Sequence, residues 1–132
     1  MQGTLKVSVI SAILKTEPGI EAIDNIKPFI TLRVGHKKYK TKTFKEKNVN
    51  PVWNEVFIFE LDGNTELEFI VHDATLYNNN IIGSNIIDLI PLLKKQKIQS
   101  WYPFVGINER KPITDGYLLL TCEIRGQGKP GI

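Results

Sequence analysis

Short runs of alternating apolar and polar residues are the feature that most constrains how this chain can fold. Such alternation sends successive side chains to opposite faces of a β-strand. It predicts eight strands, over residues 5–10, 29–34, 37–44, 55–61, 67–72, 81–87, 100–104 and 116–124. Turn-forming residues separate these runs, and Asp62-Gly63 between two of them is typical of a hairpin. The pattern therefore predicts an all-β, antiparallel sandwich or barrel.

One domain accounts for a chain of 132 residues. We expect the folded unit over residues 1–126 and a flexible tail, or the start of a linker, over the Gly- and Pro-rich residues 127–132. Helical character is confined to residues 88–98, where Pro91 suits a first helical turn and predicts a short helix near 89–97. No apolar run approaches the roughly 20 residues of a membrane-spanning helix, and no signal-peptide pattern opens the chain.

Cys122 is the only cysteine, so the chain forms no internal disulfide. Period-two alternation puts Cys122 on one face with Leu118, Leu120 and Ile124, which predicts a small core residue. The single thiol fits a reducing compartment.

Positive charge is concentrated in one stretch of the chain. The formal net charge is only +3, yet seven of the 17 basic residues lie between positions 33 and 47. They are Arg33, Lys37, Lys38, Lys40, Lys42, Lys45 and Lys47. Such a local patch indicates an anionic partner more directly than the total charge does.

Several motifs, in order along the chain, resemble the C2 domain family. Residues 50–57 read NPVWNEVF and are similar to the family's Asn-Pro-x-Trp-Asn-Glu-x-Phe signature. Residues 3–12 look like its first strand, 27–30 like its Asp-Pro-Tyr-Val, 71–73 with 82–83 like its third calcium loop and the following strand, and 115–118 like its closing strand. The resemblance covers about residues 3–125 and implies an eight-stranded C2-like sandwich of type II topology that docks on membranes, often through calcium.

The same resemblance implies that the calcium site has degenerated. Family members that bind calcium use about five aspartates, because calcium takes six to eight oxygen ligands. The matching positions here are Glu21, Lys27, Asp73, Thr75 and Asn80. They carry a formal charge of −1, and the ammonium of Lys27 repels a divalent cation. We therefore expect no bound metal and no cofactor, with Asp73 as a loop cap through an Asx turn in place of ligation.

A lysine-rich strand carries the functional hypothesis. Alternation predicts that Lys38, Lys40 and Lys42 project from one face, with Arg33 and Lys37 assisting. Some C2 domains hold phosphoinositide head groups on such a face, and their Lys-Thr-Lys-Thr run is similar to residues 40–43. Near an anionic membrane each lysine is worth roughly 1 kcal/mol. The alternative is a solvated lysine edge that blocks sheet-to-sheet aggregation.

Apolar residues at two loop tips offer a second membrane contact. Ile20 and Ile23 in the first loop, and Leu76 and Tyr77 in the third, suit insertion into the bilayer interface. Burial within the loops is the alternative. Trp53 and Trp101 are expected to anchor packing. They are not spaced as a platform on which nucleic-acid bases stack.

No catalytic arrangement is present in the sequence. His72 and Asp73 are neighbours on a strand and point to opposite faces, and no catalytic motif occurs. The sequence thus predicts a non-enzymatic, calcium-independent module that binds anionic phospholipids, phosphoinositides among them, at the cytoplasmic membrane surface. The alternative is a protein-interaction domain that binds an acidic partner, or another domain of a longer chain, through a sheet edge or the same basic face. Nucleic acid is not an expected partner.

Overall fold

In the residues described by this computed structural model, the fold consists of eight antiparallel strands and one short helix. The structure describes residues 1–16, 26–46, 50–75, 81–106 and 113–126. The elements are β1 (Gln2–Thr16), β2 (Pro28–Val34), β3 (Lys37–Lys40), β4 (Val52–Asp62), β5 (Glu66–Asp73), β6 (Ile81–Asp88), α1 (Leu92–Lys95), β7 (Lys97–Val105) and β8 (Ile113–Arg125). The predicted all-β class, the strand count and the short helix are confirmed. Pro91, which the sequence placed in the first helical turn, lies at the N-cap position just before α1.

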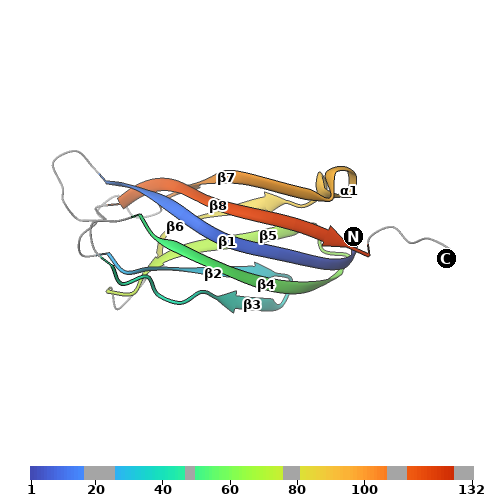
Figure 1. The fold of residues 1–132 in the computed structure, drawn as a ribbon, viewed down its shortest axis with the longest axis horizontal. Helices are drawn as coiled ribbons and strands as arrows, with labels where there is room; N and C mark the ends of the chain where they lie inside the picture. The colour runs from blue at the N-terminus through green and yellow to red at the C-terminus, as the bar shows by residue number, and fades with distance from the viewer. Residues whose placement is uncertain (17–25, 47–49, 76–80, 107–112, 127–132) are drawn as a thin grey trace.

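The strands form two facing layers (Figure 1). Their order is β3-β2-β5-β6-β7-β8-β1-β4, and a single pairing, Ser84 with Val105, joins β6 to β7. One layer is therefore β3-β2-β5-β6 and the other is β7-β8-β1-β4. β8 pairs along most of β1, as expected for the closing strand of a type II topology. The start of β1, the end of β8 and α1 lie at one end of the sandwich.

Alternate side chains of both layers meet between the sheets. The largest fully buried side chains include Phe59, Phe69 and Phe104, and the rings of Phe69 and Phe104 meet edge to face across the two layers at 6.4 Å. Cys122 is buried in the same core, which confirms its predicted place. Gly116 is required for close approach: a Cβ there would lie 2.1 Å from the carbonyl oxygen of Ile13.

The lysine-rich strand is shorter than predicted. β3 ends at Lys40, whereas alternation suggested residues 37–44. Beyond it, the Thr41 amide donates to the Ile30 carbonyl at 2.9 Å, but the reverse bond runs from the Ile30 amide to the Thr41 hydroxyl at 3.0 Å. The Pro28 carbonyl then accepts from the Phe44 amide, whereas a regular ladder would use the amide of Thr43. The side-chain bond and the inserted residue interrupt the ladder, as in a β-bulge.

Candidate functional site

The outer face of the β3-β2-β5-β6 layer carries the basic residues that the sequence singled out. Lys38 pairs across from Arg33, and Lys40 pairs across from Thr31, so alternation puts these side chains on one face. Lys38, Lys40 and Arg33 are exposed. We call this surface, which is completed by Glu68 and Ile70 on β5, the basic face.

An ion pair lowers the net charge of the basic face. Arg33 Nη2 lies 3.0 Å from Glu68 Oε1, since the two residues pair across β2 and β5. The carboxylate offsets the arginine charge, so Lys38 and Lys40 carry most of the net charge that remains here. Sequence reasoning had named Arg33 without its partner, which only the register of β2 against β5 reveals.

The side chain of Lys40 lies over a stacked pair of aromatic rings. Its Nζ lies 4.4 Å from the centroid of the Phe29 ring, which is a cation–π contact. The ring of Phe29 stacks on that of His72 at 4.6 Å with 6° between their planes. His72 Nε2 is 3.0 Å from the hydroxyl of Thr31. The ammonium of the exposed Lys40 thus lies over a ring that is itself stacked on a second ring.

Two further predicted members, Lys37 and Lys42, lie outside the regular pairing of Lys38 and Lys40 on the basic face. Lys37 alternates to the opposite side of β3, where its Nζ lies 5.0 Å from the centroid of the Tyr39 ring. Lys42 follows the end of β3, and its backbone is tied to β4: its amide donates to Glu55 Oε2 and its carbonyl accepts from Trp53 Nε1, each at 2.9 Å. Lys42 lies beyond the end of β3, so period-two alternation along β3 does not extend to it, and its place on the basic face stays a prediction.

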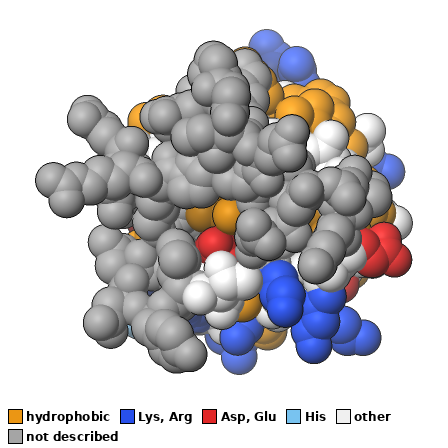
Figure 2. Space-filling view, turned by 90° about the vertical axis from the view of Figure 1, so that its left-hand side faces the viewer, with side chains coloured by type: hydrophobic (Ala, Val, Ile, Leu, Met, Phe, Trp, Pro, Cys, Tyr) orange, Lys and Arg blue, Asp and Glu red, His pale blue; other side chains and the backbone are white. Residues whose placement is uncertain are grey.

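Basic side chains gather in the lower part of one end of the molecule, at the height of β2 and β3 (Figure 2). A shallow cavity of about 60 Å³ opens on the basic face and is lined by Thr31, Arg33, Lys38, Glu68 and Ile70. That volume is far below the roughly 300 Å³ at which small-molecule pockets begin. The basic face therefore suits an extended anionic surface better than an enclosed head group.

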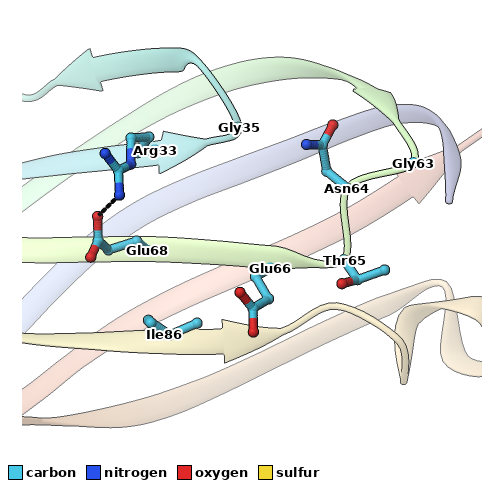
Figure 3. A pocket seen from close by; sticks show the side chains of 8 residues that line it. All are labelled: Arg33, Gly35, Gly63, Asn64, Thr65, Glu66, Glu68 and Ile86. Carbon is cyan, nitrogen blue, oxygen red and sulfur yellow. Dashed lines mark ion pairs between the residues drawn. The ribbon is translucent and has the colours of Figure 1, made fainter.

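A larger cavity lies at the other end of the sandwich, between the β2–β3 and β4–β5 turns (Figure 3). It has a volume of about 360 Å³ and is lined by Arg33, Gly35, Gly63, Asn64, Thr65, Glu66, Glu68 and Ile86. Arg33 is its single cation, and Glu68 already pairs with that cation. With Glu66 also in the lining, the cavity does not favour an anionic ligand.

Three of the five predicted calcium positions, Lys27, Asp73 and Thr75, are joined by hydrogen bonds. Asp73 is 2% exposed, and its Oδ1 accepts hydrogen bonds from the Lys27 amide at 3.2 Å, the Thr75 amide at 2.9 Å and the Thr75 hydroxyl at 2.7 Å. The Ala74 amide donates back to the Lys27 carbonyl. Asp73 thus forms the cap that the sequence suggested. In the part of the chain that is described, no three His, Cys, Asp or Glu residues are grouped as a metal site.

The remaining predicted positions lie outside the described residues. These are Glu21 and Asn80 of the calcium positions, and the loop-tip residues Ile20, Ile23, Leu76 and Tyr77. The two tryptophans differ from each other. Trp53 packs against the core as predicted, whereas the packing role expected for Trp101 is wrong, because it is 43% exposed on the outer face of β7.

Burial disfavours the thiolate form of the single cysteine. Desolvation raises the pKa of Cys122 to about 12, so the thiolate form is scarce at neutral pH. Burial also raises the pKa of Tyr102, with a smaller contribution from the neighbouring Cys122. Neither group has the depressed pKa that a nucleophile requires.

A two-layer antiparallel sandwich with one basic face and two loops joined at one end defines the class as a C2-type β-sandwich. A family model described as C2 domain matches residues 3–104. The chain therefore belongs to the C2 domain family.

Relatives among characterised proteins carry C2 domains too. Extended synaptotagmin-2-A of Xenopus laevis is 33% identical over 78 residues, which cover 57% of this chain and 9% of that protein. Protein C2-DOMAIN ABA-RELATED 3 of Arabidopsis thaliana is 32% identical over 99 residues, which cover 74% of this chain and 56% of that protein. The chain thus spans about a tenth of the first relative and about half of the second.

Solved structures show the same fold. A C2 domain-containing protein from a putative elicitor-responsive gene superposes with a TM-score of 0.76 at 23% identity, over 99% of this chain and 94% of that chain. The calcium-bound tandem C2 domains of Extended-Synaptotagmin 2 superpose with a TM-score of 0.71 at 25% identity, over 93% of this chain and 45% of that chain. None of the helices in the described segments has the length and apolar character to cross a bilayer.

Proposed function

We propose that this domain docks on anionic phospholipid surfaces through the basic face, without calcium. The observation that carries the proposal is that Lys38 and Lys40 lie exposed on one face of β3, and that Phe29 and His72 support Lys40. Roughly 1 kcal/mol of attraction for each such lysine gives weak binding that decays within a Debye length. A peripheral position at the cytoplasmic membrane surface, with no catalytic role for this domain, is part of the proposal.

The shape of the basic face bears on which lipids it binds. Its cavity is too small to enclose an inositol phosphate, and Glu68 offsets Arg33 beside it. We therefore propose that the domain responds to the density of negative charge and shows little selectivity for one head group. Phosphoinositides then bind because of their charge.

The proposal of calcium independence is supported by the three predicted calcium positions that the structure describes, Lys27, Asp73 and Thr75. Lys27, which carries a positive charge, occupies a position where the family has a calcium ligand. The buried Oδ1 of Asp73 already accepts three hydrogen bonds. Ligation by that oxygen requires breaking some of them. A metal ion therefore gains little at these positions.

The test is co-sedimentation with vesicles that contain or lack phosphatidylserine or phosphoinositide, each in calcium and in chelator. The variant Lys38→Glu/Lys40→Glu reverses both charges and is expected to lose binding to every anionic vesicle. Lys94→Glu/Lys95→Glu on α1 is the matched control, because it makes the same charge change at two exposed lysines outside the basic face.

Each outcome separates the proposal from its rivals. Equal loss in both variants would mean that total charge, and not the basic face, drives binding. Binding that requires calcium would overturn the loop argument. Absence of binding to all vesicles would favour the protein-interaction alternative.

A further inference from the structure

β4 is an edge strand whose central part is open. It is the last strand of its layer and pairs only with β1 among the described elements. The Gly63 amide donates to the Met1 carbonyl, which sets the alternation of the ladder. Because antiparallel bonding alternates, Phe57 and Phe59 bond to β1, while the N–H and C=O groups of Val56, Ile58 and Glu60 point away from it.

The described part of the segment after β3 hydrogen-bonds only to the first part of β4 and does not reach residues 56–60. Lys42 contacts Glu55 and Trp53, and at the far end the Asp62 amide is taken up by Asn64 Oδ1. Within the described residues, no hydrogen bond reaches the outward backbone groups of Val56, Ile58 and Glu60. We call residues 56–60 the open edge.

The open edge lacks the protection that the neighbouring edge has. Native sheets blunt exposed edges with lysine or proline, or with very short strands. β3 has this protection, since it is four residues long and three of them are lysines. β4 is 11 residues long and instead exposes Val56 (52%) and Ile58 (43%) on its outer face. Glu60 is the one charged side chain of the open edge, which contains no lysine or proline. A long edge of this kind beside a protected one indicates a place where another strand is added.

We propose that the open edge accepts an extended acidic segment of a partner protein as an added β-strand. One set of the added side chains would continue the apolar outer face beside Val56 and Ile58. The other set would turn toward Tyr39, whose ring contacts Phe57 and Phe59 at 5.4 and 5.0 Å and carries the ammonium of Lys37. Acidic residues alternating with valine or isoleucine fit both sides.

Charge disfavours a second copy of this chain as the occupant. Pairing two β4 edges through a two-fold axis would also bring the lysines of two β3 edges toward each other. An acidic strand meets the same lysines with opposite charge. This surface is distinct from the basic face and goes beyond membrane docking.

Amide hydrogen exchange tests the proposal directly. The probe is a synthetic peptide of about eight residues in which glutamate alternates with valine. The amides of Val56, Ile58 and Glu60 should exchange fast in the free protein and slowly with the peptide, while those of Phe57 and Phe59 are slow in both states. A peptide with lysine in place of glutamate should give no protection.

Two matched variants locate the surface. Ile58→Glu should weaken binding of the acidic peptide about tenfold, because it adds a like charge on the open edge. Ile13→Glu makes the same change at an exposed apolar residue of β1, away from the edge, and should bind as the wild type does. Both variants should sediment with anionic vesicles equally.

Three results would overturn the proposal. The first is an unchanged exchange rate at Val56, Ile58 and Glu60 with saturating peptide. The second is equal protection by the lysine peptide. The third is a dimer in solution whose formation protects the open edge without peptide, which would assign that edge to a second copy.

Discussion

The ammonium of Lys40 lies 4.4 Å from the centre of the Phe29 ring, on the outer face of the layer in which β2 lies between β3 and β5. The contact joins a lysine of the edge strand to an aromatic residue of the next strand. It fixes where one positive charge of the basic face sits, because the ring itself is held by stacking on His72.

Replacing the ring should weaken membrane binding without unfolding the domain. Phe29→Leu keeps an apolar side chain but removes the cation–π contact, which is worth about 0.5–1 kcal/mol at an exposed site. We expect vesicle affinity to fall about two- to fivefold. Co-sedimentation measures the affinity, and thermal unfolding controls for lost packing. Unchanged affinity would show that Lys40 needs no ring beneath it.

Removing the carboxylate beside Arg33 should strengthen membrane binding. Glu68→Gln leaves Arg33 without its ion-pair partner and removes one negative charge from the basic face. At about 1 kcal/mol per charge near an anionic surface, affinity should rise about fivefold at low salt and less at high salt. Glu60→Gln, on β4 of the other layer, is the control. An equal gain in both variants would contradict a local effect.

The loop cap should matter for stability. Asp73→Ala leaves the Lys27 and Thr75 amides without their acceptor and should lower the free energy of unfolding by about 1–3 kcal/mol. Thr75→Val removes only the hydroxyl bond to Asp73 and should cost less. Urea unfolding measures both. A loss for Thr75→Val as large as that for Asp73→Ala would show that the backbone bonds contribute little.

The buried thiol should be unreactive in the folded protein and should lower stability at high pH. Because the pKa of Cys122 is raised to about 12 from 9.0, the unfolded chain loses this proton first as pH rises. The protonated thiol therefore contributes fully to the free energy of unfolding below pH ~9. Between pH ~9 and pH ~12 this contribution falls by about 1.4 kcal/mol per pH unit.

Thiol labelling at pH 8, with and without urea, tests the first part of this prediction. Modification of Cys122 should follow unfolding of the chain. The variant Cys122→Ala should show a shallower loss of stability with pH. Rapid labelling of the native protein would mean that the thiol is reachable from solvent.

Much of the candidate site follows from alternation, and the exceptions have local causes. Lys38, Lys40 and Arg33 share a face because β2 and β3 are regular there. The regular ladder does not reach Lys42, because the Ile30 amide donates to the Thr41 hydroxyl instead of the Thr41 carbonyl. Period two alone does not indicate which threonine bonds to a neighbouring strand.

Burial is also decided by the whole fold. Both tryptophans lie in strands, yet Trp53 lies against the core and Trp101 on the outer face. The face of a strand that meets the core depends on the register of its neighbours. The aromatic content of a strand does not determine it.

The sequence by itself determined the class of fold, the strands and the basic character of one region, because side-chain periodicity and turn residues act locally. Only the tertiary structure decided which charges stand together and which strand edge stays open. Register and strand order determine the pairing of Arg33 with Glu68 and the contact of Lys40 with Phe29. They also determine that no described residue bonds to the outward backbone groups of the open edge. Those are set by packing between residues far apart in the chain.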